Sequence, residues 1–281
     1  MILFKRSSDI SDYLKKEKSK GKKIGFAPTM GALHRGHISL VETSLRENEI
    51  TLSSIFINPT QFNDPKDFEK YPVTLEKDIY LLENAGCDVL FLPGISEIYP
   101  HGTTANQTYE LGYLETILEG KFRPGHFQGV CQVVHRLLDI VVPHRLYIGQ
   151  KDYQQCMVIR KLIDLIDNSA KINICPTMRE ENGLAMSSRN LRLSPGSREK
   201  AGKIFATLSA IRDMLKPGPL AEMELEARHV LAESGFKVDY VEIASAENLE
   251  MPENWDGNSR MVALAAASLD NVRLIDNLLL N

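Results

Sequence analysis

The 281-residue sequence has little of what marks a membrane, secreted or nucleic-acid-binding protein. Its net charge is -4 and its pI is about 6.0, so it has no broad basic field to attract nucleic acid or anionic lipid. No run approaches ~20 apolar residues, and the N-terminus turns charged after a short apolar start, which predicts neither a signal peptide nor a membrane span. We therefore expect a cytoplasmic protein that binds no nucleic acid and no membrane.

Cysteine is scarce as well. The four cysteines form no C-x-x-C pair and no Cys/His cluster at zinc-finger spacing, which predicts free thiols in a reducing compartment. Repeats and low-complexity tracts are absent too. What remains is an ordinary globular composition, 43% hydrophobic and 25% charged, in a chain long enough for one large domain or two medium ones.

Residues 1–178 alternate short apolar strands with amphipathic helices. This order predicts a Rossmann-like α/β domain, in which helices cover both faces of a parallel sheet. We expect strands at 23–27, 51–57, 88–92, 145–148 and 171–175, and helices at 8–19, 37–48, 74–85, 127–141 and 153–166.

The pattern changes after Pro176. Residues 178–198 are polar and interrupted by glycine and proline, which predicts a linker. Helices followed by clustered strands then predict a smaller α+β domain over residues 179–281. Its expected helices are at about 195–215 and 220–234, and its expected strands are at 237–244, 261–267 and 272–280.

The richest motif, PTMGALHRGH, follows the first predicted strand of the sheet. Ligands gather at the carboxyl ends of parallel strands, and a helix N-terminus there offers free N–H groups to phosphate. Gly31 and Gly36 allow a close approach of the backbone, and His34 and His37 are spaced to stabilise charge on a leaving pyrophosphate. The residues alone leave two alternatives open: one histidine caps the helix while the other packs, or the pair contributes to a zinc site, for which no third ligand is nearby.

Other candidates follow later strands. Gln61, in FINPTQF, can donate and accept, which suits a hydroxylated carboxylate substrate. Lys151 and Asp152 suit an α-phosphate and a ribose or magnesium ion, although such pairs are often merely exposed. The segment 186–190 combines hydroxyls with a guanidinium and suits a phosphate clamp, or else an ordinary loop. Arg123, in RPGHFQGV, precedes a predicted helix and could order the site or contact phosphate, and it fits a structural turn equally well.

Taken together, the motifs resemble the pantothenate synthetase family, also called pantoate–β-alanine ligase. The resemblance covers almost the whole chain and runs in the order PTMGALHRGH, FINPTQF, RPGHFQGV, GQKDYQQ, PTMREENGLAMSSRN and RLIDN. The H-x-G-H element also resembles the signature of nucleotidylyltransferases and class I aminoacyl-tRNA synthetases. Two departures from the family pattern are Val73, where arginine is frequent, and Asp270-Asn271-Val272, where Gly-x-Thr is common.

The resemblance implies particular roles for residues of this sequence. Catalysis would fall to His34, His37, Lys151 and Arg189, and pantoate binding to Gln61 and Gln155. A lid would run from about Asp64 to Thr74. The ATP site would comprise Met30, Gly31, Ala32, Leu33, His34, Arg35, Gly36, His37, Gly149, Gln150, Lys151, Asp152, Met178, Met186, Ser187, Ser188 and Arg189.

The reaction so implied joins pantoate and β-alanine to pantothenate through a pantoyl adenylate, with ATP as co-substrate, Mg²⁺ on its phosphates and a homodimer as the assembly. A simple adenylyl- or cytidylyltransferase is the alternative enzyme, but GQKDYQQ and FINPTQF argue against it. A catalytically silent nucleotide sensor or an RNA-binding relative is the alternative outside enzymes. The acidic pI argues against RNA binding.

Overall fold

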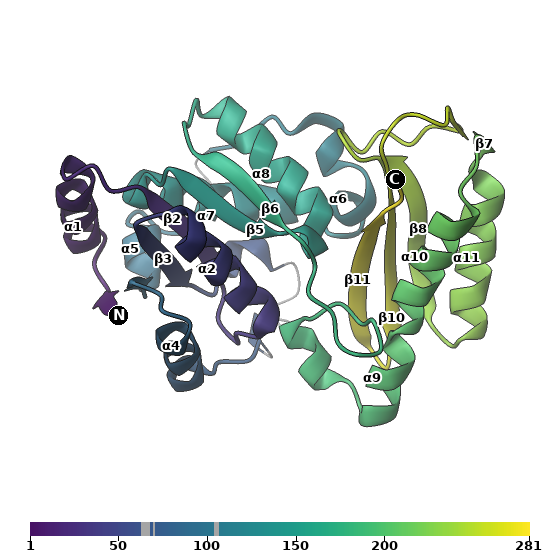
Figure 1. Cartoon of the computed structure of the whole chain (residues 1–281), viewed down its shortest axis with the longest axis horizontal. Helices are drawn as coiled ribbons and strands as arrows, with labels where there is room; N and C mark the ends of the chain where they lie inside the picture. The colour runs from purple at the N-terminus through teal and green to yellow at the C-terminus, as the bar shows by residue number, and fades with distance from the viewer. Residues whose placement is uncertain (63–67, 70, 104–106) are drawn as a thin grey trace. The chain divides into compact units, whose positions relative to one another are not determined.

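The computed structural model describes residues 1–62, 68–69, 71–103 and 107–281, and the chain forms two compact units (Figure 1). Unit 1 comprises Met1–Gly149 and Gln154–Cys175, and unit 2 comprises Gln150–Tyr153 and Pro176–Asn281. Each unit has its own sheet and its own helices.

Unit 1 is built on a six-stranded sheet in the order β1-β4-β3-β2-β5-β6. Every neighbouring pair is parallel. The central strand β3 is buried at every position, as expected where both faces of a parallel sheet are covered. The predicted α/β fold is therefore confirmed. The strands are β1 Ile2–Phe4, β2 Ile24–Thr29, β3 Ile50–Ile55, β4 Val89–Phe91, β5 Arg145–Gly149 and β6 Lys171–Cys175.

Helix α2 packs on β2, β3 and β5, where Ile38, Leu40 and Val41 join the apolar core. Helix α1 packs on α7. The helices of this part of the chain are α1 Ser7–Ser19, α2 Arg35–Glu47, α4 Leu75–Asn84, α5 Ile95–Ile98, α6 Leu118–Phe122, α7 His126–Val141 and α8 Tyr153–Leu165, with short 3₁₀ turns η1 Pro59–Gln61, η2 Gly112–Glu115 and η3 Gln150–Asp152.

Strand β1 was not predicted from the sequence. Its three residues pair in parallel with β4, with Ile2 opposite Val89 and Phe4 opposite Phe91. Ile2 and Leu3 are 47% and 40% exposed, as befits an edge strand. A strand this short has no periodicity to reveal it, and only its distant partner makes it a strand.

Unit 2 contains a three-stranded antiparallel sheet in the order β11-β10-β8, with helices α10 and α11 packed side by side along it (Figure 1). The core between them is apolar and includes Leu208, Leu231 and Val241, all fully buried. The elements are η4 Ser188–Arg192, α9 Pro195–Ala201, α10 Lys203–Met214, β7 Gly218–Pro219, α11 Ala221–Glu233, β8 Lys237–Ser245, β9 Asn254–Trp255, β10 Met261–Leu269 and β11 Val272–Leu279.

Two expectations for this region are wrong. The single helix over 195–215 is two helices, α9 and α10, which separate at Gly202. The carbonyl oxygen of Asn182 lies so close to Gly202 that a Cβ there would be 2.3 Å from it, which explains the glycine. The polar linker over 178–198 is a folded part of unit 2, because Leu184 and Leu193 enter its core and Arg179 bridges to Ala185. Its polar composition hides these few apolar anchors.

The departure at Asp270-Asn271 forms an ordinary hairpin turn. Both residues have positive φ, 48° and 61°, and they join Leu269 to its cross-strand partner Val272. A two-residue turn with this geometry matches the twist of the flanking strands and tolerates Asp and Asn. Glycine is therefore not required here.

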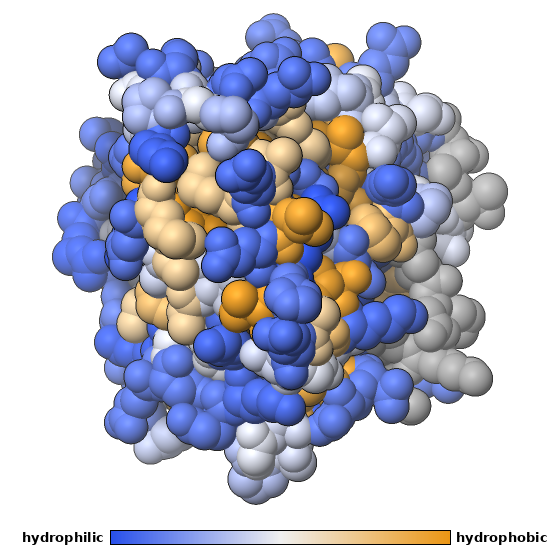
Figure 2. All heavy atoms as spheres, turned by 90° about the vertical axis from the view of Figure 1, so that its right-hand side faces the viewer, coloured by the Kyte–Doolittle hydropathy of each residue, from blue (hydrophilic) through white to orange (hydrophobic). Residues whose placement is uncertain are grey.

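Among the described residues, no helix combines the length and the apolar character needed to cross a membrane. On the side that carries β7 and α11, apolar and polar residues are intermixed over the visible face (Figure 2).

Candidate active site

The order of the strands in unit 1 creates a switch point at β2. From β2 the chain continues to β3 and β4 on one side of the sheet, while β5 and β6 lie on the other. Ligands of open α/β sheets bind at such points, outside the carboxyl ends of the strands. Three of the predicted motifs lie at the carboxyl ends of β2 and its neighbours β3 and β5, which end at Thr29, Ile55 and Gly149.

The loop after β2 is held from behind by a buried carboxylate. Asp78, in α4, is 1% exposed and accepts hydrogen bonds from the backbone N–H groups of Ala32 at 2.9 Å and Leu33 at 2.7 Å. The hydroxyl of Thr74 donates to the same carboxylate at 3.1 Å. Gly31 and Ala32 have φ of 82° and 48°, so this loop has a shape that needs such support.

Asp78 is absent from the residues that the motifs single out, but the sequence carries a signal for it. The predicted helix 74–85 has an apolar face that includes Leu75 and Leu82. Asp78 lies on that same face, three residues after Leu75 and four before Leu82. A carboxylate within an apolar stripe requires buried hydrogen-bond donors, which the loop supplies.

His34 and His37 form a reciprocal capping box at the start of α2. Nδ1 of His34 accepts from the N–H of Gly36 at 3.1 Å, and Nδ1 of His37 accepts from the N–H of His34 at 3.3 Å. The ring centroids are 4.0 Å apart. Of the alternatives left open, capping is therefore correct for both histidines and not for one alone.

Capping also fixes the tautomer of each ring. A nitrogen that accepts from a backbone N–H carries no proton, so each neutral ring is protonated at Nε2. Both histidines therefore present an Nε2–H donor. The structure brings two donors of one kind together at a helix N-terminus, where anions are favoured.

The other residues of this motif differ in what they can offer. Ala32 and Leu33 are 5% and 4% exposed, so their side chains belong to the core and only their backbone is available. Arg35 pairs with Glu42 at 2.6 Å, further along α2. Any contact of these three residues with a ligand is thus expected through the backbone.

Gln61 lies in the turn η1 beside the loop after β2. Its Nε2 donates to the sulfur of Met30 at 3.0 Å, and its Oε1 accepts from Asn58 at 3.2 Å. Asn58 is 1% exposed and also donates to the carbonyl of Gly129 at 3.1 Å. The structure therefore brings the PTMGALHRGH and FINPTQF motifs into contact.

Arg123 and His126 of the RPGHFQGV motif support Gln61. Nδ1 of His126 lies 2.8 Å from the carbonyl oxygen of Gln61, which can only accept, so this nitrogen carries the proton. Nε2 of His126 then accepts from Arg123 at 3.1 Å. Arg123, which the sequence left between a turn and a phosphate contact, is placed to order Gln61.

The last two of the three glutamines in GQKDYQQ, Gln154 and Gln155, lie in different environments. Gln154 is 3% exposed, accepts from the N–H of Glu119 and donates to the carbonyls of Leu114 and Ile117. Gln155 is half-buried in the first turn of α8. Gln154 is structural, which leaves Gln155 as the glutamine accessible to a substrate.

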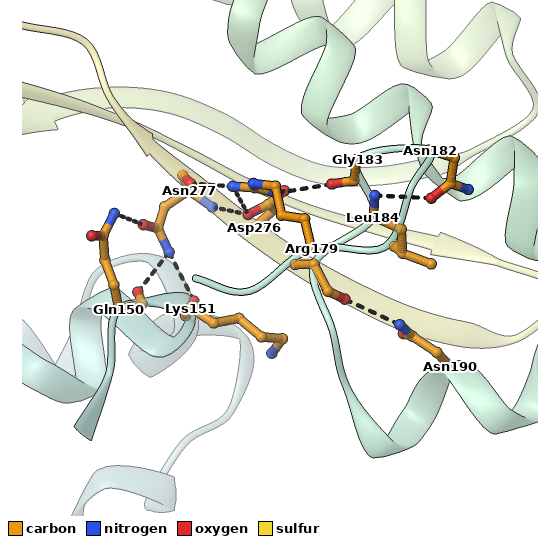
Figure 3. A network of polar contacts seen from close by, with 10 residues as sticks. Gln150, Lys151, Arg179, Asn182, Gly183, Leu184, Asn190, Asp276 and Asn277 are labelled. Atoms are coloured by element: carbon orange, nitrogen blue, oxygen red, sulfur yellow. Dashed lines mark hydrogen bonds and ion pairs between the residues drawn. The ribbon is translucent and has the colours of Figure 1, made fainter. Parts of the chain in front are cut away.

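In unit 2, the turn η3 carries Lys151 and Asp152, whose charged groups are 3.6 Å apart. The hydroxyl of the next residue, Tyr153, donates to the carbonyl of Ala246 at 2.6 Å. Figure 3 shows Gln150 and Lys151 beside Asn277 of β11. This turn is therefore anchored by the C-terminal part of the chain.

The remaining candidates, Met178 and Met186–Arg189, lie in a segment that folds back on itself. The N–H of Met186 donates to the carbonyl of Met178 at 2.9 Å. Ser187 caps η4 by accepting from the N–H of Arg189 at 3.3 Å. Asn190 is 2% exposed and ties this turn to Glu180 and Ala185. The two serines and Arg189 thus occupy a defined turn and not an unstructured clamp.

A sequence model of the Pantoate-beta-alanine ligase family matches residues 2–279 of the chain. The chain belongs to this family. Pantothenate synthetases of Cytophaga hutchinsonii and Bacteroides fragilis are each 44% identical to it over 271 residues, which cover 95% and 96% of this chain and 95% of each relative.

Two solved structures of pantoate–β-alanine ligases share the fold over the whole chain. Pantothenate synthetase from Thermus thermophilus is 40% identical with a TM-score of 0.91, over 100% of this chain and 99% of that chain. The pantoate-beta-alanine ligase from Francisella tularensis, complexed with beta-gamma ATP and beta-alanine, is 38% identical with a TM-score of 0.83, over 100% and 98%. The chain is thus a ligase by family.

The thiols of Cys87 and Cys131 are not suited to act as nucleophiles. All four cysteines are buried, and burial raises the pKa of Cys87 and Cys131 to about 12. Such thiols are protonated at neutral pH and are poor nucleophiles. Within the described part of the chain, no three His, Cys, Asp or Glu side chains gather where they could hold a metal ion.

Proposed function

We propose that this chain joins (R)-pantoate to β-alanine with the energy of ATP, and that it releases pantothenate, AMP and pyrophosphate. The observation that carries the proposal is the capped histidine pair at the start of α2, directly after the switch-point strand, in a chain of this family. The ligands named for the Francisella tularensis enzyme, beta-gamma ATP and beta-alanine, agree with two of the three substrates.

The proposed reaction has two steps. A carboxylate oxygen of pantoate attacks the α-phosphorus of ATP, the bond to the β-phosphate breaks, and pyrophosphate leaves. The neutral amine of β-alanine then attacks the acyl carbon of the pantoyl adenylate, loses a proton and displaces AMP. Adenylation gives the acid a leaving group that a bare carboxylate lacks.

In unit 1, we assign the backbone of Met30–His37 and of Gly149 to ATP. Nε2–H of His34 and of His37 would donate to the phosphates as negative charge grows on pyrophosphate, with His37 as the proton donor. Gln61 and Gln155 would bind the hydroxyl and carboxylate groups of pantoate. The fixed tautomers of the capping box support the donor roles.

In unit 2, we assign Gln150–Asp152, Met178 and Met186–Arg189 to ATP. Lys151 and Arg189 would neutralise phosphate charge during adenylation. Mg²⁺ would neutralise further charge on the phosphates, since it is usually held by substrate phosphates, several waters and one or two carboxylates. The half-exposed carboxylate of Asp152 is suited to such a magnesium–nucleotide complex, directly or through water.

We further propose that residues 1–178 and 179–281 form the two functional domains, that the protein is cytoplasmic and that it is a homodimer. Residues 64–67 and 70 of the proposed lid, residues 64–74, lie outside the described residues. Of its described part, Tyr71 packs against Phe62 with ring centroids 5.8 Å apart. Light scattering of the purified protein tests the dimer: the mass of one 31.6 kDa chain would contradict it.

Product analysis tests the reaction. With ATP, pantoate and β-alanine, mass spectrometry should detect pantothenate and AMP, and with β-alanine omitted, labelled pyrophosphate should still exchange into ATP. Exchange should require pantoate, since the carboxylate must accept AMP. An adenylyl- or cytidylyltransferase would instead leave the nucleotide on its product, and a silent nucleotide sensor would give no product. Pantothenate formed with neither exchange nor a quenched adenylate would exclude the two-step route.

A further inference from the structure

Asn277, in the terminal RLIDN motif, makes three hydrogen bonds to the turn η3 (Figure 3). Its Nδ2 donates to the carbonyl oxygens of Gln150 at 2.9 Å and Lys151 at 2.8 Å, and its Oδ1 accepts from Nε2 of Gln150 at 3.1 Å. The side chain is 1% exposed. One buried amide therefore spends most of its hydrogen-bonding capacity on one turn.

Asn277 is itself fixed by a buried ion pair. Arg179 donates to the two oxygens of Asp276 at 2.6 and 3.1 Å, and to the carbonyl of Asn277 at 3.2 Å. Asp276, 5% exposed, in turn accepts from the N–H of Asn277 at 2.8 Å. Arg179 is held over the ring of Phe205, 3.8 Å from its centroid. The backbone N–H and C=O of Asn277 are therefore both hydrogen-bonded, in addition to the bonds that its side chain makes to the turn.

These bonds fix the direction of two peptide planes. In a trans peptide the N–H points away from the C=O of the same plane. Because the carbonyls of Gln150 and Lys151 point to Asn277, the N–H groups of Lys151 and Asp152 point away from it. Successive N–H groups on one side of a turn suit an anion such as phosphate.

We propose that Asn277 is a positioning residue, which holds the Gln150–Lys151 carbonyls so that the opposite face of the turn is set for a phosphate of ATP. The proposal rests on the assignment of this turn to ATP under the proposed function. The Arg179–Asp276 pair completes the device by fixing Asn277. From the sequence, the RLIDN motif was given no role, so this contact was not predicted.

The test compares Asn277→Ala with Asn277→Asp, which keeps the shape but loses the donor, in the full-length protein. Asn281→Ala is the matched control, because that amide also binds backbone groups, those of Ser259 and of Met261 in β10, but none of η3. Each variant is measured for its melting temperature, for the KM of ATP and of pantoate, and for pyrophosphate exchange.

We expect both Asn277 variants to fold and to raise the KM of ATP or depress exchange by about 10-fold to 100-fold, since a misplaced binding group costs up to about 10². The KM of pantoate should stay within about twofold, and Asn281→Ala should behave as the parent. A purely structural role would lower the melting temperature and leave the KM values of the folded fraction unchanged, which would overturn the proposal. Failure of both variants to fold would overturn it as well.

Lys151→Ala, measured in parallel, distinguishes an error in the positioning role of Asn277 from an error in the assignment of the turn to ATP. If Lys151→Ala impairs ATP use and the Asn277 variants do not, the positioning role is wrong while the proposed function stands. If Lys151→Ala uses ATP normally, the assignment of the turn to ATP is wrong, and the positioning role falls with it.

Discussion

Two segments assigned to ATP are supported from behind by side chains of opposite character. The loop after β2 in unit 1 turns backbone N–H groups inward, and the carboxylate of Asp78 accepts from them. The turn η3 in unit 2 turns carbonyls inward, and the amide of Asn277 donates to them. A segment that buries N–H groups therefore needs an acceptor side chain, and one that buries carbonyls needs a donor, because a buried polar group without a partner is costly.

The largest expected effect concerns His37, whose ring caps the helix through Nδ1 and would donate to phosphate through Nε2–H. Asparagine places an acceptor where Nδ1 lies, so His37→Asn should keep the cap but lose the Nε2–H donor. We expect pyrophosphate exchange to fall by about 10²–10³ with little change in melting temperature.

Glutamine is a usual capping-box residue at this position, because its amide reaches the N-cap N–H. His37→Gln should therefore keep the cap and the melting temperature, and its exchange rate should fall as that of His37→Asn does, since both variants lose the imidazole donor. Normal exchange in His37→Asn would show that His37 only supports the helix.

The next effect tests the carboxylate support. Asp78→Asn leaves one inward N–H facing an NH₂ group, so the free energy of unfolding should fall by about 1–3 kcal/mol, measured by urea denaturation. Turnover should fall as the loop loses its shape. Glu83→Gln, an exposed carboxylate in the same helix α4, is the control and should be neutral.

The two supports can also be ranked. Orphaned buried N–H groups are rarer than under-satisfied carbonyls, so Asp78→Asn should destabilise the fold more than Asn277→Ala does. The reverse order in the same denaturation experiment would show that the support by Asn277 contributes more to stability than the support by Asp78.

A smaller effect is expected from the support of Gln61. His126→Phe removes the donor to the Gln61 carbonyl, and the KM of pantoate should rise about tenfold, the value of one good hydrogen bond. The KM of ATP should change little, because Gln61 is assigned to pantoate and not to the nucleotide. His135→Phe, in the same helix but bonded to Tyr109, is the control. A selective rise in the KM of ATP would mean that Gln61 serves the nucleotide instead.

The smallest effect extends the comparison to a weak donor. The thiol of Cys156 lies 3.4 Å from the carbonyl oxygen of Gly149, at the end of β5. Because a thiol is a weak donor, Cys156→Ala should change the KM of ATP by less than about twofold. Cys175→Ala, which removes another buried thiol, controls for lost packing. A tenfold rise confined to Cys156→Ala would place this carbonyl among the essential supports.

Where the apolar pattern extends over a whole element, the sequence was sufficient to predict that element. The strand at 171–175 and the helix at 127–141 were predicted within one residue of the structure, because periodic burial leaves a record in each segment. The break at Gly202 was invisible, since the Asn182 carbonyl that crowds it belongs to another segment. Asp78 was visible in principle, as the one carboxylate on an apolar helix face.

The parallel α/β sheet, the order of the motifs along it and the family could all be predicted from the sequence, because apolar periodicity and motif chemistry are local properties of the chain. The side chains that hold those motifs in shape became apparent in the folded structure alone. Asn277 reaches Gln150 across 127 residues of sequence, and Asp78 reaches Ala32 across 46. Hydrogen bonds act over about 3 Å in space whatever the separation along the chain, so the partner of a buried backbone group is fixed only when the fold closes around it.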